Sequence, residues 1–105
     1  MRSTRDVIIK TDRFEAARAF YRDVLGFELF QDDARMLGFE TGSFRLFVEP
    51  GTPPGAVFDF EVSDLAAAKA LLVEHGCSVE EDDASVPRLY LRDPFGLVFN
   101  IAEPD

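Results

Sequence analysis

The feature that most constrains this chain is an internal duplication. The apolar run around Phe14 returns 51 positions later around Leu65, and each copy ends in a glycine, at Gly26 and Gly76. A unit of about 50 residues rarely buries enough apolar surface to fold alone. The two halves are therefore expected to share a core or to pair with another chain, and the seam between them is a natural place for a ligand.

The segment from Pro50 to Gly55 is the densest cluster of chain breakers and predicts a stiff connector. We expect one domain over residues 1–105, with module one at 1–49, the connector at 50–55 and module two at 56–105. Each module is predicted to run strand, helix and three strands. The expected strands are 7–9, 27–32, 36–41 and 44–49 in module one, and 57–62, 79–81, 86–91 and 97–102 in module two.

Helix boundaries are predicted from capping residues. Asp12 is the expected N-cap of the first helix, with Glu15 completing a capping box, and Ser63-Asp64 caps the second. Gly26 and Gly76 are expected to end the helices in a left-handed conformation. His75, the only histidine, then falls in the last turn of the second helix as a capping or surface residue.

Composition excludes several classes of partner. The chain is 47% hydrophobic, which suits one compact domain, and its formal charge of -9 repels phosphate backbones and anionic membranes. We therefore expect no nucleic-acid or membrane partner. The charge fits solubility, and it also fits an acidic groove for a cationic ligand. No apolar stretch reaches the length of a membrane span, so a cytoplasmic protein is expected.

Three short segments have predicted local roles. Cys77 is the only cysteine, which rules out a disulfide framework within the chain and favours a small buried residue. The acidic run from Glu80 to Asp83 is predicted to be a solvated hairpin tip. The sequence Asp-Pro-Phe-Gly at 93–96 is typical of a tight turn just before the last strand.

Strand alternation predicts which side chains share a face. With Val7, Ile9, Phe58, Phe60 and Val62 assigned to the helix-packing side, the opposite, inward face carries Asp6, Ile8 and Lys10, then Val57, Asp59 and Glu61, then Val98, Asn100 and Ala102. A buried carboxylate without a partner is costly. The three inward carboxylates are therefore expected to reach water, to pair with basic side chains such as Lys10, Arg88 or Arg92, or to bind a cation.

The segment Phe-Tyr-Arg-Asp-Val-Leu-Gly-Phe at 20–27, the half-chain repeat and the turn at 93–96 together resemble the vicinal oxygen chelate superfamily. That superfamily includes glyoxalase I, bleomycin resistance proteins and extradiol dioxygenases. The resemblance covers essentially the whole chain. It implies an α+β fold of two tandem βαβββ modules, whose curved mixed sheets surround a cavity.

Enzymes of this superfamily usually hold a divalent metal through His or Glu on inward strands of both modules. Matched position by position, those ligands fall on Asp6, Val57, Asn100 and Leu46, or on Arg45 if the register slips by one. None of these is His or Glu. Because a divalent ion needs three or four anionic or imidazole donors, we expect no metal, no cofactor and no catalytic residue.

The resemblance then implies a metal-free protein, similar to bleomycin resistance proteins, that sequesters a small cationic or planar aromatic ligand. Tyr90 corresponds to cavity-lining positions of drug-binding relatives and could stack on such a ligand. The expected ligand-binding residues are Asp6, Ile8, Leu46, Val57, Asp59, Glu61, Tyr90 and Asn100. Relatives often pair as homodimers, so a homodimer is expected.

Three alternatives stay open at the level of sequence. The first is a metal-dependent glyoxalase- or dioxygenase-type enzyme that uses other ligands, for example Asp6 with Asp59 or Glu61. The second is a metal-independent acid-base enzyme with Asp6 or Glu61 as the base. The third is a plain interaction module.

Overall fold

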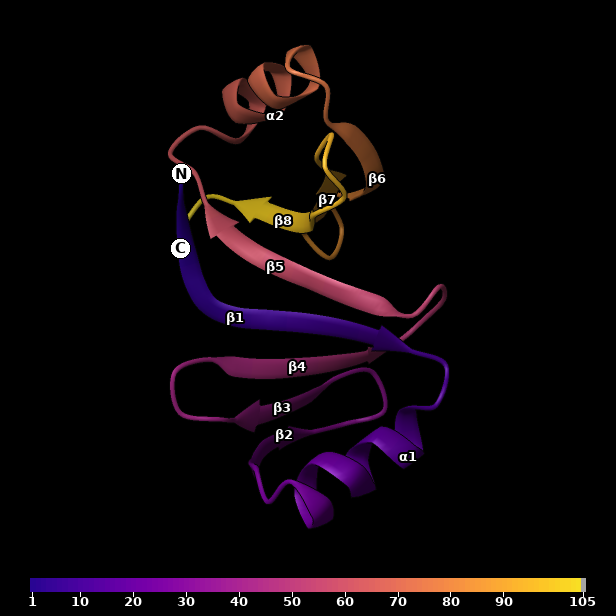
Figure 1. Cartoon of the computed structure of the whole chain (residues 1–105). Helices are drawn as coiled ribbons and strands as arrows, with labels where there is room; N and C mark the ends of the chain where they lie inside the picture. Colours follow the sequence, from indigo (N-terminus) through magenta and orange to yellow (C-terminus); the bar gives the residue numbers. More distant parts are fainter. Residues whose placement is uncertain (105) are drawn as a thin grey trace. The chain divides into compact units, whose positions relative to one another are not determined.

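A computed structural model of the chain describes residues 1–104. The chain divides into two compact units: the first is Arg5–Ala56, and the second combines Met1–Thr4 with the chain from Val57 onward. Each unit contains four neighbouring strands and one helical crossover (Figure 1). The expected α+β class and the strand, helix and three-strand order of both halves are confirmed.

The first unit is built on four neighbouring strands in the order β2-β3-β4-β1. Its strands are β1 (Arg2–Thr11), β2 (Glu28–Asp32), β3 (Leu37–Glu40) and β4 (Arg45–Pro50). β1 and β4 are parallel, and the other neighbours are antiparallel. The crossover from β1 to β2 consists of α1 (Phe14–Ala19) and a π-helical turn, η1 (Phe20–Val24). Phe14, Ala17 and Tyr21 of this crossover pack on buried Leu37, Phe39, Leu46 and Val48.

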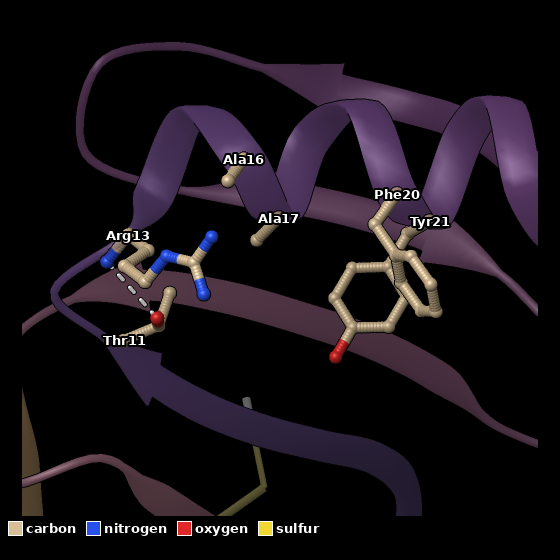
Figure 2. A pocket seen from close by; sticks show the side chains of 6 residues that line it. All are labelled: Thr11, Arg13, Ala16, Ala17, Phe20 and Tyr21. Atoms are coloured by element: carbon tan, nitrogen blue, oxygen red, sulfur yellow. Dashed lines mark hydrogen bonds between the residues drawn. The ribbon is translucent and has the colours of Figure 1, made fainter.

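The start of α1 differs from the predicted capping box. The N-cap residue is Arg13, not Asp12, and no side chain caps the helix. Thr11 Oγ1 at the end of β1 instead accepts the backbone N–H of Arg13 at 3.0 Å (Figure 2). The other end agrees with the sequence, because Gly26 has a positive φ of 72°, a conformation that glycine adopts without strain.

The second unit repeats this plan with the strand order β5-β8-β7-β6. Its elements are β5 (Gly55–Glu61), α2 (Leu65–Glu74), β6 (Ser78–Asp83), β7 (Arg88–Arg92) and β8 (Val98–Ala102). Asp64 is the N-cap of α2 and accepts the N–H of Ala67 at 3.0 Å, as predicted. Cys77 is buried in a core cluster with Val62, Leu89, Leu91, Phe99 and Ile101. Exposed His75 is the C-cap of α2.

The acidic run was predicted to be a hairpin tip, and this prediction is wrong. All four residues, Glu80 to Asp83, lie within β6, which pairs with β7 and forms the edge of its sheet. Glu80 pairs with Arg92 at 2.5 Å and Asp82 with Lys69 at 2.8 Å. Charged side chains on an edge strand discourage pairing with another sheet, which gives the acidic run a structural role.

Candidate functional site

One face of the first unit's sheet carries no helix, and strand register decides which side chains lie on it. Asp6 lies opposite Arg45, and Ile8 lies opposite Phe47. The alternate residues, including Ile9 and Leu46, pack in the cluster beneath α1. Asp6, Ile8, Arg45 and Phe47 therefore share the helix-free face, as alternation predicts for Asp6 and Ile8.

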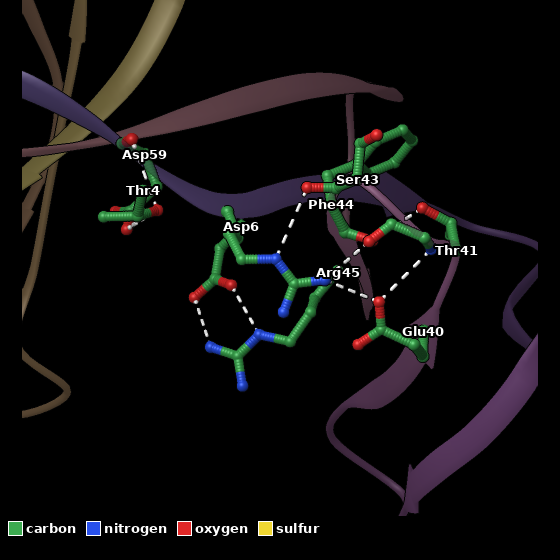
Figure 3. A network of polar contacts seen from close by, with 10 residues as sticks. Thr4, Asp6, Glu40, Thr41, Ser43, Phe44, Arg45 and Asp59 are labelled. Carbon is green, nitrogen blue, oxygen red and sulfur yellow. Dashed lines mark hydrogen bonds and ion pairs between the residues drawn. The ribbon is translucent and has the colours of Figure 1, made fainter.

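Asp6 and Arg45 form a two-point ion pair on this face. Arg45 Nε lies 2.8 Å from Asp6 Oδ1, and Arg45 Nη2 lies 3.0 Å from Asp6 Oδ2 (Figure 3). The hydrogen bond that Arg45 donates to the Asp6 carboxylate, opposed in part by desolvation, raises the pKa of the Arg45 guanidinium above its usual value. The parallel strands place these two residues side by side, and the charged guanidinium of Arg45 therefore lies on this face.

The same guanidinium lies over two phenylalanine rings. Its carbon is 5.4 Å from the ring centre of Phe47 and 5.9 Å from that of Phe30, within the range of cation–π attraction. The two rings meet edge to face, with centres 5.7 Å apart. We call Phe30, Phe47 and Arg45 the aromatic platform. Phe30 is 46% exposed, so part of the platform is open to a ligand.

Gly38 makes room for the platform. A Cβ atom at this position would lie 2.8 Å from the ring of Phe30, closer than real contacts allow. Glycine in β3 therefore lets the Phe30 ring lie directly against the sheet, a close approach that strand glycines often permit. Sequence reasoning missed Phe30, because the eleven phenylalanines were mostly assigned to the core. In the structure, β2 has an irregularity between Leu29 and Gln31, next to this ring.

A second ion pair borders the platform. Arg5 Nη2 lies 2.6 Å from Glu40 Oε1 and also donates to the carbonyl oxygen of Gly42 at 2.8 Å. The Glu40 carboxylate accepts the N–H of Gly42 at 3.2 Å. The hydrogen bond from Arg5, followed by that from Gly42, lowers the pKa of Glu40 below its usual 4.5.

The lowered pKa of Glu40 predicts an acid-dependent loss of stability. Its contribution is present above pH 4.5, the unfolded value, and is lost as the pH falls through the lower folded value. We expect urea unfolding to show a stability difference between the wild type and Glu40→Gln that is largest near about pH 6 and shrinks toward about pH 3. A difference that stays constant over this range would contradict the assignment, since glutamine keeps the hydrogen-bonding oxygen without the charge.

In the second unit, the helix-free face carries a hydrogen-bonded row that includes Asp59 and Asn100, which are opposite one another in β5 and β8. Asp59 Oδ2 accepts the hydroxyl of Thr4 at 2.8 Å, and Oδ1 accepts Asn100 Nδ2 at 2.9 Å. Asn100 Oδ1 accepts the N–H of Leu89 at 2.9 Å. Both side chains therefore have their main hydrogen-bonding groups engaged within the unit.

Other residues expected to bind the ligand have varied surroundings. Tyr90 is only 2% exposed, and the Arg88 guanidinium lies 5.0 Å from its ring centre. Val57 is buried, and Glu61 lies 3.9 Å from Arg2. Leu46 belongs to the cluster beneath α1, so Arg45, the alternative that a one-residue slip allowed, is the residue that shares a face with Asp6.

The side chains at the superfamily's metal positions do not fit a divalent ion. Asp6 is engaged by a guanidinium, Asn100 offers one neutral oxygen that already accepts a hydrogen bond, and Val57 offers hydrocarbon. Within residues 1–104, no three His, Cys, Asp or Glu side chains group closely enough to hold a metal ion. A cation next to Asp6 would also meet the charge of Arg45, which opposes its binding.

Comparison with known proteins gives a family match and several structural matches. A family model described as a glyoxalase-like domain matches residues 6–102. A superfamily member from Vibrio splendidus 12B01, described as glyoxalase/bleomycin resistance protein/dioxygenase, is 16% identical with a TM-score of 0.66, covering 93% of this chain and 96% of its own. No curated protein matches the chain significantly.

Two longer proteins also share the fold. Homoprotocatechuate 2,3-dioxygenase from Brevibacterium fuscum, in complex with 3,4-dihydroxyphenylacetate, is 22% identical with a TM-score of 0.68. The Mn(II)-bound glyoxalase from Novosphingobium aromaticivorans is 22% identical with a TM-score of 0.65. Each match covers 98% of this chain, but only 36% of the dioxygenase and 41% of the glyoxalase. Identities this low indicate a common fold and leave activity to be argued from the site.

Proposed function

This chain belongs to the glyoxalase-like domain family, and we propose that it is a metal-free protein that binds a planar aromatic small molecule at the aromatic platform. The observation that carries the proposal is the Asp6–Arg45 ion pair at positions where relatives place metal ligands. The guanidinium that pairs with Asp6 is also the one that lies over Phe30 and Phe47. Arg45 thus occupies Asp6, which is then unsuited to a metal ion, and Arg45 also forms part of the aromatic platform.

The platform has the chemistry to recognise a flat ring. Exposed Phe30 offers apolar and aromatic contact, and Arg45 adds cation–π attraction. Among the described residues, Arg45 Nη1 makes no hydrogen bond, so it is free to donate to an oxygen of the ligand.

The expected alternative of a cationic ligand has less support. Asp6 is paired with Arg45, Asp59 has hydrogen bonds to both oxygens, and Glu61 lies near Arg2. Carboxylates that are already satisfied attract a cationic guest less strongly than free ones. We therefore assign the planar aromatic class.

Ligand screening with metal removal tests the proposal. We expect planar aromatic compounds to raise the thermal unfolding temperature, because a bound ligand at 100 times its Kd adds about 2.7 kcal/mol of stability. The rise should be equal with and without EDTA, since the proposed site uses no metal. Elemental analysis of protein purified without chelator should show no stoichiometric metal. Near-stoichiometric Zn, Ni, Mn or Fe, or stabilisation that EDTA abolishes, would instead favour the metal-dependent glyoxalase- or dioxygenase-type enzyme.

The oligomeric state and the cellular location of the protein remain predictions. We propose a homodimer, and light scattering that gives one chain per particle would contradict it. No helix among residues 1–104 has the length and apolar character to span a membrane. The proposed cytoplasmic location is testable by cell fractionation.

A further inference from the structure

The first unit contains a pocket that is separate from the aromatic platform. It lies between α1 and the end of β1, on the helix-covered side of the sheet, and has a volume of about 330 Å³. Its lining residues are Thr11, Arg13, Ala16, Ala17, Phe20 and Tyr21 (Figure 2). The volume is at the small end of the range for ligand pockets.

Arg13 supplies an uncompensated charge to this pocket. Within residues 1–104, seven of the nine arginines pair with a carboxylate, and Arg13 has no such partner although the chain carries a net charge of -9. The bond from its backbone N–H to Thr11 Oγ1 positions the backbone of this exposed residue at the start of α1. Its guanidinium extends beside Ala17 in the space between α1 and the strands (Figure 2).

Tyr21 brings a second hydrogen-bonding group. Its ring is held by stacking on Phe27, with centres 6.3 Å apart, and by a tilted contact with Phe39 at 5.6 Å. The hydroxyl points to the same side of the helix as the Arg13 guanidinium (Figure 2) and makes no hydrogen bond with the described residues. A half-buried tyrosine usually uses its hydroxyl, so this group is available to a ligand.

The remaining walls suit a small apolar body. Ala16 and Ala17 present only methyl groups, and the Phe20 ring is 47% exposed. A guanidinium binds a carboxylate through two parallel hydrogen bonds, and a phenol donates a third. We propose that this pocket binds a small ionised carboxylic acid, with its carboxylate on Arg13 and Tyr21 and a short apolar or aromatic body against Ala16, Ala17 and Phe20.

Titration of the full chain with benzoate, followed by amide NMR, tests the pocket. We expect saturable shifts at Ala16, Ala17 and Tyr21 with a weak Kd of about 1 mM, since the net negative charge opposes anions at long range and limits the affinity. Uncharged benzamide should bind about tenfold more weakly, because the charge-assisted bonds to Arg13 are lost. Tyr21→Phe, which keeps the ring, should weaken benzoate about threefold.

Arg13→Gln should weaken benzoate binding about tenfold. The matched control is Arg35→Gln. Among the described residues, Arg35 is the other arginine that forms no ion pair, so this variant removes the same charge and should leave the affinity for benzoate unchanged. If Arg13→Gln disturbs the amide spectrum, the test uses Arg13→Lys in its place. Lysine cannot make the two-point contact with a carboxylate, so Arg13→Lys should still weaken benzoate binding.

Three results would overturn the inference. The first is the absence of shifts at the pocket, and the second is an equal loss of affinity in the Arg13 and Arg35 variants, which would indicate a bulk charge effect. The third is a set of shifts confined to Phe30, Arg45 and Phe47. That third result would assign benzoate to the aromatic platform, so it would support the proposed function while removing this pocket.

Discussion

Replacing Phe39 with alanine is expected to lower the free energy of unfolding by about 3–5 kcal/mol. Phe39 is fully buried, and it is the largest of the fully buried side chains. It lies in the cluster beneath α1, where its ring centre is 5.6 Å from that of Tyr21. Removing the ring loses its transfer free energy and leaves a cavity between sheet and helix that cannot fully collapse.

Urea unfolding of Phe39→Ala and of a matched control gives the measurement. Phe95→Ala removes the same ring from a turn where it is 93% exposed, so a change within about 0.5 kcal/mol is expected. Because small domains are stable by only about 5–15 kcal/mol, Phe39→Leu provides a milder variant if the alanine protein does not fold. Equal effects of the buried and exposed changes would contradict the assigned core.

We expect this loss to reach both units. β1 contributes Arg2–Thr4 to the second unit and Arg5–Thr11 to the first, so one strand is part of both. A unit of about 50 residues is also marginal alone. In Phe39→Ala, the protection of backbone amides against hydrogen exchange should therefore fall at Leu91 of the second unit as well as at Val48 of the first.

The fold was predictable because local signals agreed with each other. The repeated apolar run, the glycines at Gly26 and Gly76 and the cap at Asp64 all indicated the same order of elements, which the structure confirms. The errors came from side-chain partners that are distant or ambiguous in sequence. Arg13, not Asp12, is the N-cap residue of α1, and its N–H binds Thr11. The acidic run pairs with Lys69, Arg88 and Arg92, which no local charge pattern reveals.

The candidate site was only partly predictable. Alternation placed Asp6 and Ile8 on one face, because strand side chains alternate wherever the register is regular. It did not single out Phe47 among eleven phenylalanines, most of which were assigned to the core. Gly38 was the available signal, since a glycine inside a strand often marks the close approach of another group, here the Phe30 ring.

Phe47→Ala is expected to weaken binding of planar aromatic ligands about tenfold or more, because stacking on one aromatic side chain is worth about 1–3 kcal/mol. The loss has two sources. The ring itself disappears as a contact surface, and Phe30 and Arg45 lose the neighbour against which both are packed. Isothermal titration with the best compound from the aromatic screen measures the change, and urea unfolding checks that the variant is folded.

Two further variants separate platform geometry from general loss of apolar surface. Phe44→Ala removes a 40% exposed ring next to Arg45 in sequence but outside the platform, so affinity should not change. Gly38→Ala keeps every aromatic residue, yet its Cβ would meet the Phe30 ring at 2.8 Å and displace it. We expect Gly38→Ala to weaken binding by less than Phe47→Ala. If Phe44→Ala costs as much as Phe47→Ala, or if Gly38→Ala has no effect, the ligand does not lie on the platform, since the arrangement of Phe30 over the sheet would then be irrelevant to binding.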